Sequence, residues 1–243
     1  KEELPEATFI LGGVHPTFMW KELLEEPGSP VDIVVRGEAE QTVEEMFRAL
    51  LDGGDLSVVD GLAYRDNGAA RMTQGRGFLP DLEAYPAAFD IVDWPVYTYF
   101  VVPRSRLGAV STSRGCNFTC TFCSQQKFWS RSWRGRQPEH VVEEIRRLHD
   151  DYGVRVILFA DEYPTLNPGR WEEILDRIIA LKREIYLLME TRAADIVRDR
   201  AILPKYRQAG IVHVYVGLEA TDQETLDRID KKSSVDEGRE SLS

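Results

Sequence analysis

Apolar runs alternate with amphipathic stretches along most of the chain, and this pattern predicts strands that alternate with helices. An apolar run at 8–11 ends in a pair of glycines, and a second run at 31–35 follows a helical stretch near 17–25. The stretch 42–51 repeats apolar residues at helical spacing, which predicts a helix with one buried face. This order is typical of a parallel α/β domain.

A second series of strand–helix pairs begins near residue 107. Four strands are predicted, at 108–112, 154–160, 185–189 and 211–218. Each is followed by a predicted helix, at 138–152, 168–181, 196–208 and 222–229. Polar residues follow the strands, at the end where βα-barrels build their active sites. Four units do not close a barrel, so the pattern predicts a partial one.

Turn residues and prolines dominate the segment between the two series. A short strand at 61–64 precedes Asn67-Gly68, which is a typical hairpin turn, and prolines fall at 80, 86, 95 and 103. We interpret this segment as a linker. The expected domains are therefore 1–55 and 107–243, with the linker over 56–106.

Composition and charge narrow the class of protein. The 243 residues are 43% hydrophobic and 29% charged, which is typical of a globular chain with one large domain or two smaller ones. The net charge of −11 argues against nucleic-acid binding, because the phosphate backbone would be repelled. Neither a transmembrane run nor a signal peptide is evident, so we expect a cytoplasmic protein.

The chain has three cysteines, Cys116, Cys120 and Cys123, all in one short segment. An odd number in a cytosolic protein argues against disulfides. Three thiolates on one loop can hold three irons of a 4Fe-4S cluster and leave the fourth iron open to a ligand. Zinc is the alternative, but it prefers four ligands, and the nearest downstream histidine is His140. Unliganded thiols are the third possibility.

The run Cys116-Asn-Phe-Thr-Cys120-Thr-Phe122-Cys123 resembles the signature of the radical S-adenosylmethionine superfamily, C-x3-C-x-aromatic-C. The resemblance extends from 107 to about 230 and includes the strand–helix alternation. It implies a 4Fe-4S cluster whose open iron binds the amino and carboxylate groups of S-adenosylmethionine. One-electron reduction would then cleave this cofactor to a 5′-deoxyadenosyl radical, and Phe122 would pack near the adenine.

Charged residues after the later strands are candidate contacts to S-adenosylmethionine. Asp161 and Glu162 offer carboxylates to an ammonium group, with a solvated acidic pair as the alternative. Glu190 can accept hydrogen bonds from ribose hydroxyls, and Arg192 can form a fork with a carboxylate, with a structural salt bridge as the alternative. Glu219 resembles a similarly placed acid of the superfamily.

Two N-terminal segments, at 11–17 and 36–40, resemble the end of the cobalamin-binding domains that precede many radical S-adenosylmethionine domains. Glycines after a strand let the backbone approach a bulky ligand, although a Gly-Gly pair alone indicates only a tight turn. The implied cobalamin contacts are Gly12, Gly13, His15, Gly37 and Glu38. The expected α/β fold is thus the C-terminal part of a Rossmann-like cobalamin-binding domain followed by a partial radical S-adenosylmethionine barrel.

Three stretches, 123–129, 160–167 and 203–214, narrow the resemblance to the anaerobic magnesium-protoporphyrin IX monomethyl ester oxidative cyclases of photosynthetic bacteria. This implies oxygen-independent closure of the fifth ring, with oxygen from water, and an electron donor such as flavodoxin or ferredoxin. Aromatic and basic side chains suit a porphyrin that carries a carboxylate, although a rim loop with snorkelling cations is the alternative. The candidate substrate contacts are Lys127, Trp129, Arg131, Trp133 and Arg134.

Two rival functions remain at this point. A cobalamin-dependent radical methyltransferase has the same modules and differs in its substrate pocket. A non-catalytic zinc-binding interaction module predicts a tetrahedral metal with four ligands and no brown colour. A flavin or nicotinamide oxidoreductase is disfavoured, because no G-x-G-x-x-G follows a strand.

Overall fold

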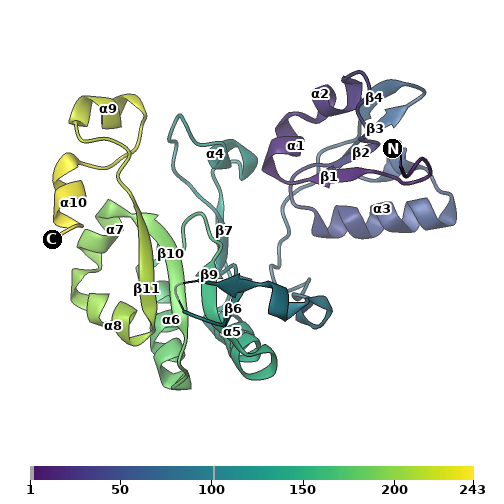
Figure 1. The fold of residues 1–243 in the computed structure, drawn as a ribbon. Coiled ribbons are helices and arrows are strands. Elements are labelled where there is room, and N and C mark those ends of the chain that lie inside the picture. The colour runs from purple at the N-terminus through teal and green to yellow at the C-terminus, as the bar shows by residue number, and fades with distance from the viewer. Residues whose placement is uncertain (1–2, 101) are drawn as a thin grey trace. The chain divides into compact units, whose positions relative to one another are not determined.

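The computed structural model describes residues 3–100 and 102–243, which fold into two compact units (Figure 1). The first unit ends at Tyr85 and the second runs from Pro86 to Ser243. Within the described residues, no helix has both the length and the apolar character that crossing a membrane requires. Each unit has its own sheet and its own hydrophobic core.

A four-stranded mixed sheet forms the centre of the first unit. Its order is β1 (Ile10–Gly12), β2 (Ile33–Val35), β3 (Leu62–Asp66) and β4 (Ala69–Met72), with β1 and β2 parallel and the rest antiparallel. The helices are α1 (Val14–Phe18), α2 (Trp20–Glu25) and α3 (Glu40–Asp52), with a short 3-10 turn η1 (Leu56–Val58). Residues of β2 alternate between two cores, since Ile33 and Val35 pack with Met46 while Val34 packs with Leu24.

The segment expected to be a linker, 56–106, is instead divided between the two units. The Asn67-Gly68 turn closes a hairpin as expected, but its strand β3 pairs with β2, where Leu62 and Ala63 are fully buried. The later part contains two 3-10 turns, η2 (Phe89–Ile91) and η3 (Trp94–Val96), and belongs to the second unit. Burial of the aromatic rings Phe89 and Trp94 against Tyr152 explains why this proline-rich stretch is folded.

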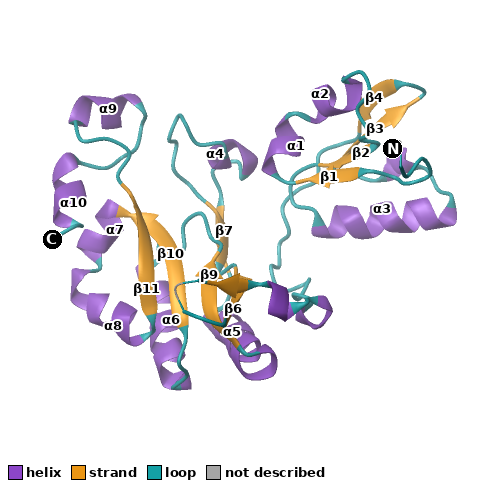
Figure 2. Ribbon diagram, viewed as in Figure 1, coloured by secondary structure: helices purple, strands orange, loops and turns teal. Residues whose placement is uncertain are grey.

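The second unit is a five-stranded sheet in the order β11-β10-β9-β6-β5, and Figure 2 shows its helices beside the strands. The strands are β5 (Thr98–Tyr99), β6 (Ser105–Val110), β9 (Val154–Phe159), β10 (Tyr186–Arg192) and β11 (Ile211–Gly217). Neighbours from β6 to β11 are parallel, and β5 is antiparallel to β6. The four predicted parallel strands and the partial barrel are therefore confirmed.

The helices of the second unit bury a large apolar core. They are α4 (Gln125–Phe128), α5 (Pro138–Tyr152), α6 (Pro168–Leu181), α7 (Ala193–Arg198), α8 (Leu203–Gln208), α9 (Gln223–Arg228) and α10 (Val235–Glu240). Trp171 of α6 is fully buried and packs edge-on against Phe159 of β9, with 5.7 Å between the ring centres. The single helix expected at 196–208 is two helices joined by η4 (Arg200–Ile202), and Pro204 lies in the first turn of the second helix, where no amide hydrogen is needed.

Candidate active site

The three cysteines lie on a loop between two short strands, β7 (Ser113–Gly115) and β8 (Trp133–Gly135). The strands pair antiparallel, with Gly115 opposite Trp133. Gly115 has a φ of 89°, and a Cβ added to it would lie 2.2 Å from the carbonyl oxygen of Ser132. Only glycine fits this position, so the ribbon fixes the point from which the cysteine loop leaves.

Cys116, Cys120 and Cys123 are free thiols, and Cys120 is only 9% exposed. The amide of Cys123 donates to the carbonyl of Cys120 at 3.1 Å, which closes a tight turn. Burial raises the pKa of Cys120, while the positive charges of Lys231 and Arg192 oppose the shift. Three reduced thiols on one loop, with cations nearby, are a donor set that fits an iron–sulfur cluster.

Zinc and an iron–sulfur cluster need different arrangements of their ligands. Zinc needs its ligands around one ion, and the described part of the chain has no group of three His, Cys, Asp or Glu side chains arranged to hold one ion. A cluster distributes its thiolates over different irons, so its ligands need not converge on one point.

Asp161 and Glu162 follow β9 and hold the strand that leads into the cysteine loop. Asp161 is 3% exposed, and its carboxylate accepts hydrogen bonds from the Thr112 amide (2.8 Å), the Thr112 hydroxyl (2.8 Å) and the Ser113 hydroxyl (2.5 Å). Glu162 accepts from the amide of Gly115 at 2.9 Å. Both acids thus have protein donors, a geometry that favours positioning of the loop over the expected contact with a cofactor ammonium.

Two cavities open where the parallel strands end. One of about 460 Å³ and one of about 220 Å³ share three lining residues, Glu162, Glu190 and Tyr215. Desolvation raises the pKa of Glu190, and the nearby Glu162 and Asp161 raise it further. The structure therefore brings together acids that the sequence places after separate strands, although the role of Glu190 toward ribose stays a prediction.

Arg192, at the end of β10, connects three segments. Its guanidinium lies 3.5 Å from the centre of the Phe118 ring in the cysteine loop, and it donates to the carbonyls of Lys231 and Lys232. The fork with a cofactor carboxylate stays a prediction, and the guanidinium packs on the Phe118 ring of the cysteine loop. Phe122 is 54% exposed, so its ring is accessible, as an adenine contact requires.

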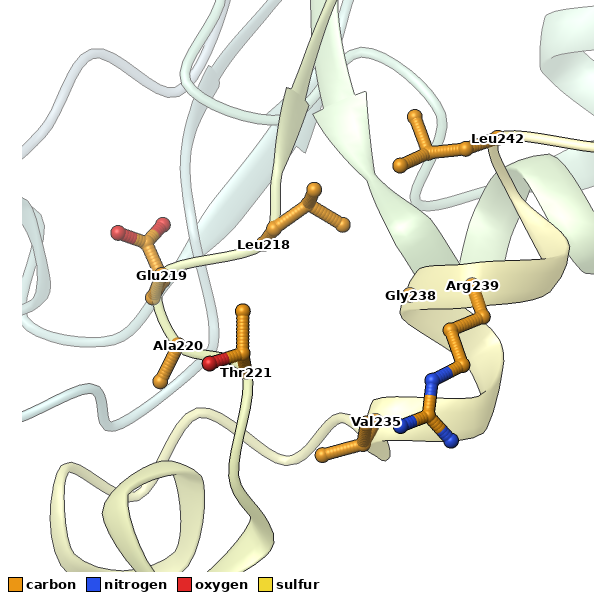
Figure 3. Close-up of a pocket in the computed structure, with 8 residues that line it drawn as sticks. All are labelled: Leu218, Glu219, Ala220, Thr221, Val235, Gly238, Arg239 and Leu242. Atoms are coloured by element: carbon orange, nitrogen blue, oxygen red, sulfur yellow. The ribbon is translucent and has the colours of Figure 1, made fainter.

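Glu219 follows β11 in a left-handed conformation, with φ 67°. Its carboxylate lies 2.7 Å from the ammonium of Lys231, whose side chain is 9% exposed. A further cavity of about 470 Å³ lies between the Leu218–Thr221 segment and α10, and Figure 3 shows the Glu219 carboxylate pointing away from α10. Sequence analysis missed Lys231, since a Lys-Lys pair in a charged run is typical of a solvated surface.

The expected substrate contacts fall into two groups. Trp129 is 8% exposed, and its indole donates to Glu162 at 2.8 Å, with the Arg134 guanidinium 5.6 Å from its ring centre. The indole of Trp133 donates to the carbonyl of Tyr163 at 2.9 Å. Stacking of a substrate on Trp129 does not fit this geometry, because packing within the loop covers the ring.

In contrast, Lys127 and Arg131 are exposed on the same loop. Arg131 has a φ of 55°, and its Nε donates to the side-chain oxygen of Gln126 at 3.3 Å. Both cations are accessible, and their contact with a substrate carboxylate stays a prediction.

In the first unit, the glycine loops lie at the same edge of the sheet. Gly12 ends β1 opposite Val35 of β2, so Gly13 and Gly37 follow neighbouring parallel strands. Both have positive φ values, 100° and 75°, and a Cβ added at either would meet no atom within 4 Å. This open space suits close approach of a bulky ligand to the backbone.

The other residues of these loops differ in accessibility. His15 is exposed in α1, whereas Glu38 is 8% exposed and accepts a hydrogen bond from the amide of Leu79 at 2.7 Å. Two nitrogens of Arg36, Nε and Nη1, are buried without a hydrogen-bond partner among the described residues. The geometry thus gives Glu38 a structural partner and leaves donors of Arg36 available beside Gly37.

Comparison with curated proteins finds relatives along the full chain. An anaerobic magnesium-protoporphyrin IX monomethyl ester cyclase from Synechocystis sp. is 38% identical over 243 residues, which are 100% of this chain and 48% of that protein. The cyclase from Cereibacter sphaeroides is 36% identical over 99% of this chain and 40% of its own length. A hopanoid C-3 methylase from Methylococcus capsulatus is 27% identical over 100% of this chain and 45% of its own length. The chain thus spans about half the length of these relatives.

A solved structure shares the fold. The radical S-adenosylmethionine methyltransferase TsrM from Kitasatospora setae superposes with a TM-score of 0.72 at 18% identity, over 99% of this chain and 48% of that chain. Residues 110–242, more than half of the chain, match the family described as Radical SAM superfamily. The match contains the cysteine loop and the three parallel strands β9, β10 and β11 of the second unit, and the chain therefore belongs to the radical S-adenosylmethionine superfamily.

Proposed function

We propose that the chain carries the cofactor-binding units of a cobalamin-dependent radical S-adenosylmethionine enzyme that closes the fifth ring of magnesium-protoporphyrin IX monomethyl ester without oxygen. The observation that carries the proposal is similarity to the cyclases over all 243 residues. Both the glycine loops of the first unit and the cysteine loop of the second lie within this similarity. The cluster, when bound, supplies the electron that cleaves S-adenosylmethionine.

The side chains of the second unit have distinct tasks in this proposal. Cys116, Cys120 and Cys123 hold the cluster, and the exposed ring of Phe122 packs on the adenine. Glu190, which lines both cavities, accepts hydrogen bonds from the ribose. Asp161 and Glu162 hold the strand before the cysteine loop, so that the thiols keep their places while the cofactor binds.

Cobalamin binds the first unit in this proposal, against the backbone at Gly12, Gly13 and Gly37. The open space beside Gly13 and Gly37 supports this, because a side chain there would block a large planar ligand. His15 is accessible beside the same loop. The partner that supplies the electron is a protein of the flavodoxin or ferredoxin class.

The substrate is a porphyrin that carries carboxylates. Lys127 and Arg131 are the exposed cations of the cysteine loop, and they are the residues that we expect to meet a propionate group. A methyltransferase is the second candidate, favoured by the 27% identity with the hopanoid methylase. The two candidates share the cofactors and differ in the product.

The test is anaerobic reconstitution of the protein with iron and sulfide, followed by turnover. The protein is incubated with magnesium-protoporphyrin IX monomethyl ester, S-adenosylmethionine, cobalamin and a flavodoxin reducing system in heavy-oxygen water. The cyclase proposal requires 5′-deoxyadenosine together with a five-ring product that carries the heavy oxygen. The Cys120→Ala variant serves as the control and should form neither product.

Other outcomes separate the candidates. A product that gains a methyl group and no heavy oxygen would show that the protein is a methyltransferase and not a cyclase. Stoichiometric tight zinc in a colourless protein would overturn the enzymatic proposal as a whole. Reconstitution is followed by electron paramagnetic resonance of the reduced protein, in which S-adenosylmethionine should change the cluster signal.

A further inference from the structure

The turn at 229–232 packs directly against the cysteine loop. The amide of Thr121 donates to the carbonyl of Ile229 at 2.9 Å, and the hydroxyl of Thr119 donates to the carboxylate of Asp230. Asp230 and Lys232 both have left-handed conformations, with φ 54° and 53°. This sharply bent turn therefore holds a segment more than a hundred residues away in sequence.

Lys231, between these two residues, points into the site. It is 7% exposed, its ammonium lies 2.7 Å from Glu219, and it lies 5.8 Å from the centre of the Phe122 ring. It lines the 220 Å³ cavity together with Glu190. The side chain packs closely against β11, since a Cβ added at Gly217 would lie 2.9 Å from the ammonium.

We propose that Lys231 is a positioning residue that places a fixed positive charge beside the cysteine loop and thereby favours one-electron reduction of the cluster held there. The inference rests on the proposed function, since it requires the cluster. Reduction adds one negative charge, which comes from a one-electron donor of the flavodoxin or ferredoxin class. A buried cation stabilises that added charge more strongly than a solvated one, because water screens it less.

Arg192 adds a second positive charge near the thiols, and it is present in every variant compared below, so the neighbours that decide the test are those of the two lysines. Glu219 neutralises part of the charge, but its side chain is 34% exposed, so its own field is partly screened. Lys232 is 61% exposed and pairs with Asp230 at 2.6 Å. Two adjacent lysines thus differ mainly in burial, and Lys232 is a matched control for Lys231.

The experiment compares reconstituted wild-type protein with Lys231→Met, Lys231→Arg, Glu219→Gln and Lys232→Met. The midpoint potential of the cluster is measured by redox titration with electron paramagnetic resonance. Lys231→Met should lower the reduction equilibrium constant at least tenfold, which is about 59 mV toward negative potential for a one-electron couple. Lys231→Arg should recover most of this loss, Lys232→Met should cause none, and Glu219→Gln should shift the potential in the opposite direction.

Each outcome of the redox titration leads to a different conclusion. A wild-type protein that forms no cluster overturns the proposed function, and with it this inference. A wild-type cluster whose potential does not change in Lys231→Met overturns the inference alone. A shift of Glu219→Gln in the same direction as Lys231→Met also overturns it, because loss of packing would move both variants alike, whereas a fixed charge moves them apart.

Discussion

The buried carboxylate of Asp161 provides the sharpest test of how the cysteine loop is held. We compare Asp161→Ala with Asp161→Asn. One carboxylate oxygen accepts from the amide of Thr112, and the other accepts from the hydroxyls of Thr112 and Ser113. Asparagine can keep its carbonyl toward the amide and donate its amide hydrogens to both hydroxyls, which can rotate to accept. Alanine can do neither.

The expected magnitudes follow from this difference. In Asp161→Ala the amide of Thr112 loses its partner in a buried place, at a cost of about 1–3 kcal/mol, and the lost hydroxyl bonds add about 1 kcal/mol each. We expect the free energy of unfolding to fall by about 3–5 kcal/mol. Asp161→Asn replaces charged hydrogen bonds by neutral ones of the same geometry, so we expect the free energy of unfolding to fall by about 1 kcal/mol.

The assay is urea unfolding of the reduced apoprotein, followed by tryptophan fluorescence. Four of the five tryptophans lie in the second unit, so the signal reports mainly on the unit that contains Asp161. Equal losses for alanine and asparagine would refute the reasoning, since they would mean that the negative charge, and not the hydrogen-bond geometry, holds the strand. A loss below about 1 kcal/mol for alanine would mean that Thr112 finds another acceptor.

Three further predictions concern the same loop. Gly115→Ala should lower the free energy of unfolding by about 3 kcal/mol or more, measured by the same urea titration, because its Cβ would meet the carbonyl of Ser132. Trp129→Phe should cost about 1 kcal/mol through the lost bond to Glu162 and leave the Kd of the porphyrin unchanged in a fluorescence titration; weaker porphyrin binding would restore the stacking role. Cys120→Ala should abolish the brown cluster absorbance and reduce bound iron, and retained cleavage of S-adenosylmethionine would contradict the ligand assignment.

Sequence patterns predicted those parts of the fold that depend on local information. The apolar runs at 154–160 and 211–218 gave β9 and β11 nearly to the residue, because a buried parallel strand needs a continuous apolar run. The structure of the proline-rich stretch before residue 107 could not be predicted in the same way. Phe89 and Trp94 fold there because Tyr152, far away in sequence, covers them, and no local pattern carries that contact.

The candidate site shows the same division between local and long-range information. The spacing of the cysteines is a local property, and it indicated the donor set directly. Burial of Trp129 and of Lys231 depends on partners at Glu162 and Glu219, which follow two other strands. An aromatic ring beside a cation can pack against a ligand or against other residues of the protein. Only the three-dimensional structure shows which of the two covers the ring.

Asp161 and Glu162 show why position at the end of a strand does not by itself define a cofactor contact. A carboxylate at the carboxyl edge of a parallel sheet can bind a ligand or bind the loop that surrounds the ligand, and both tasks need the same residue type at the same place. The donors favour the second task for these two acids, because the amides of Thr112 and Gly115 lie within 3 Å of them and each carboxylate already has a protein partner. Glu190 lines the same two cavities as Glu162, and it is the acid that we expect to meet S-adenosylmethionine. Glu190→Gln should therefore weaken binding of that cofactor, while Asp161→Asn leaves it nearly unchanged.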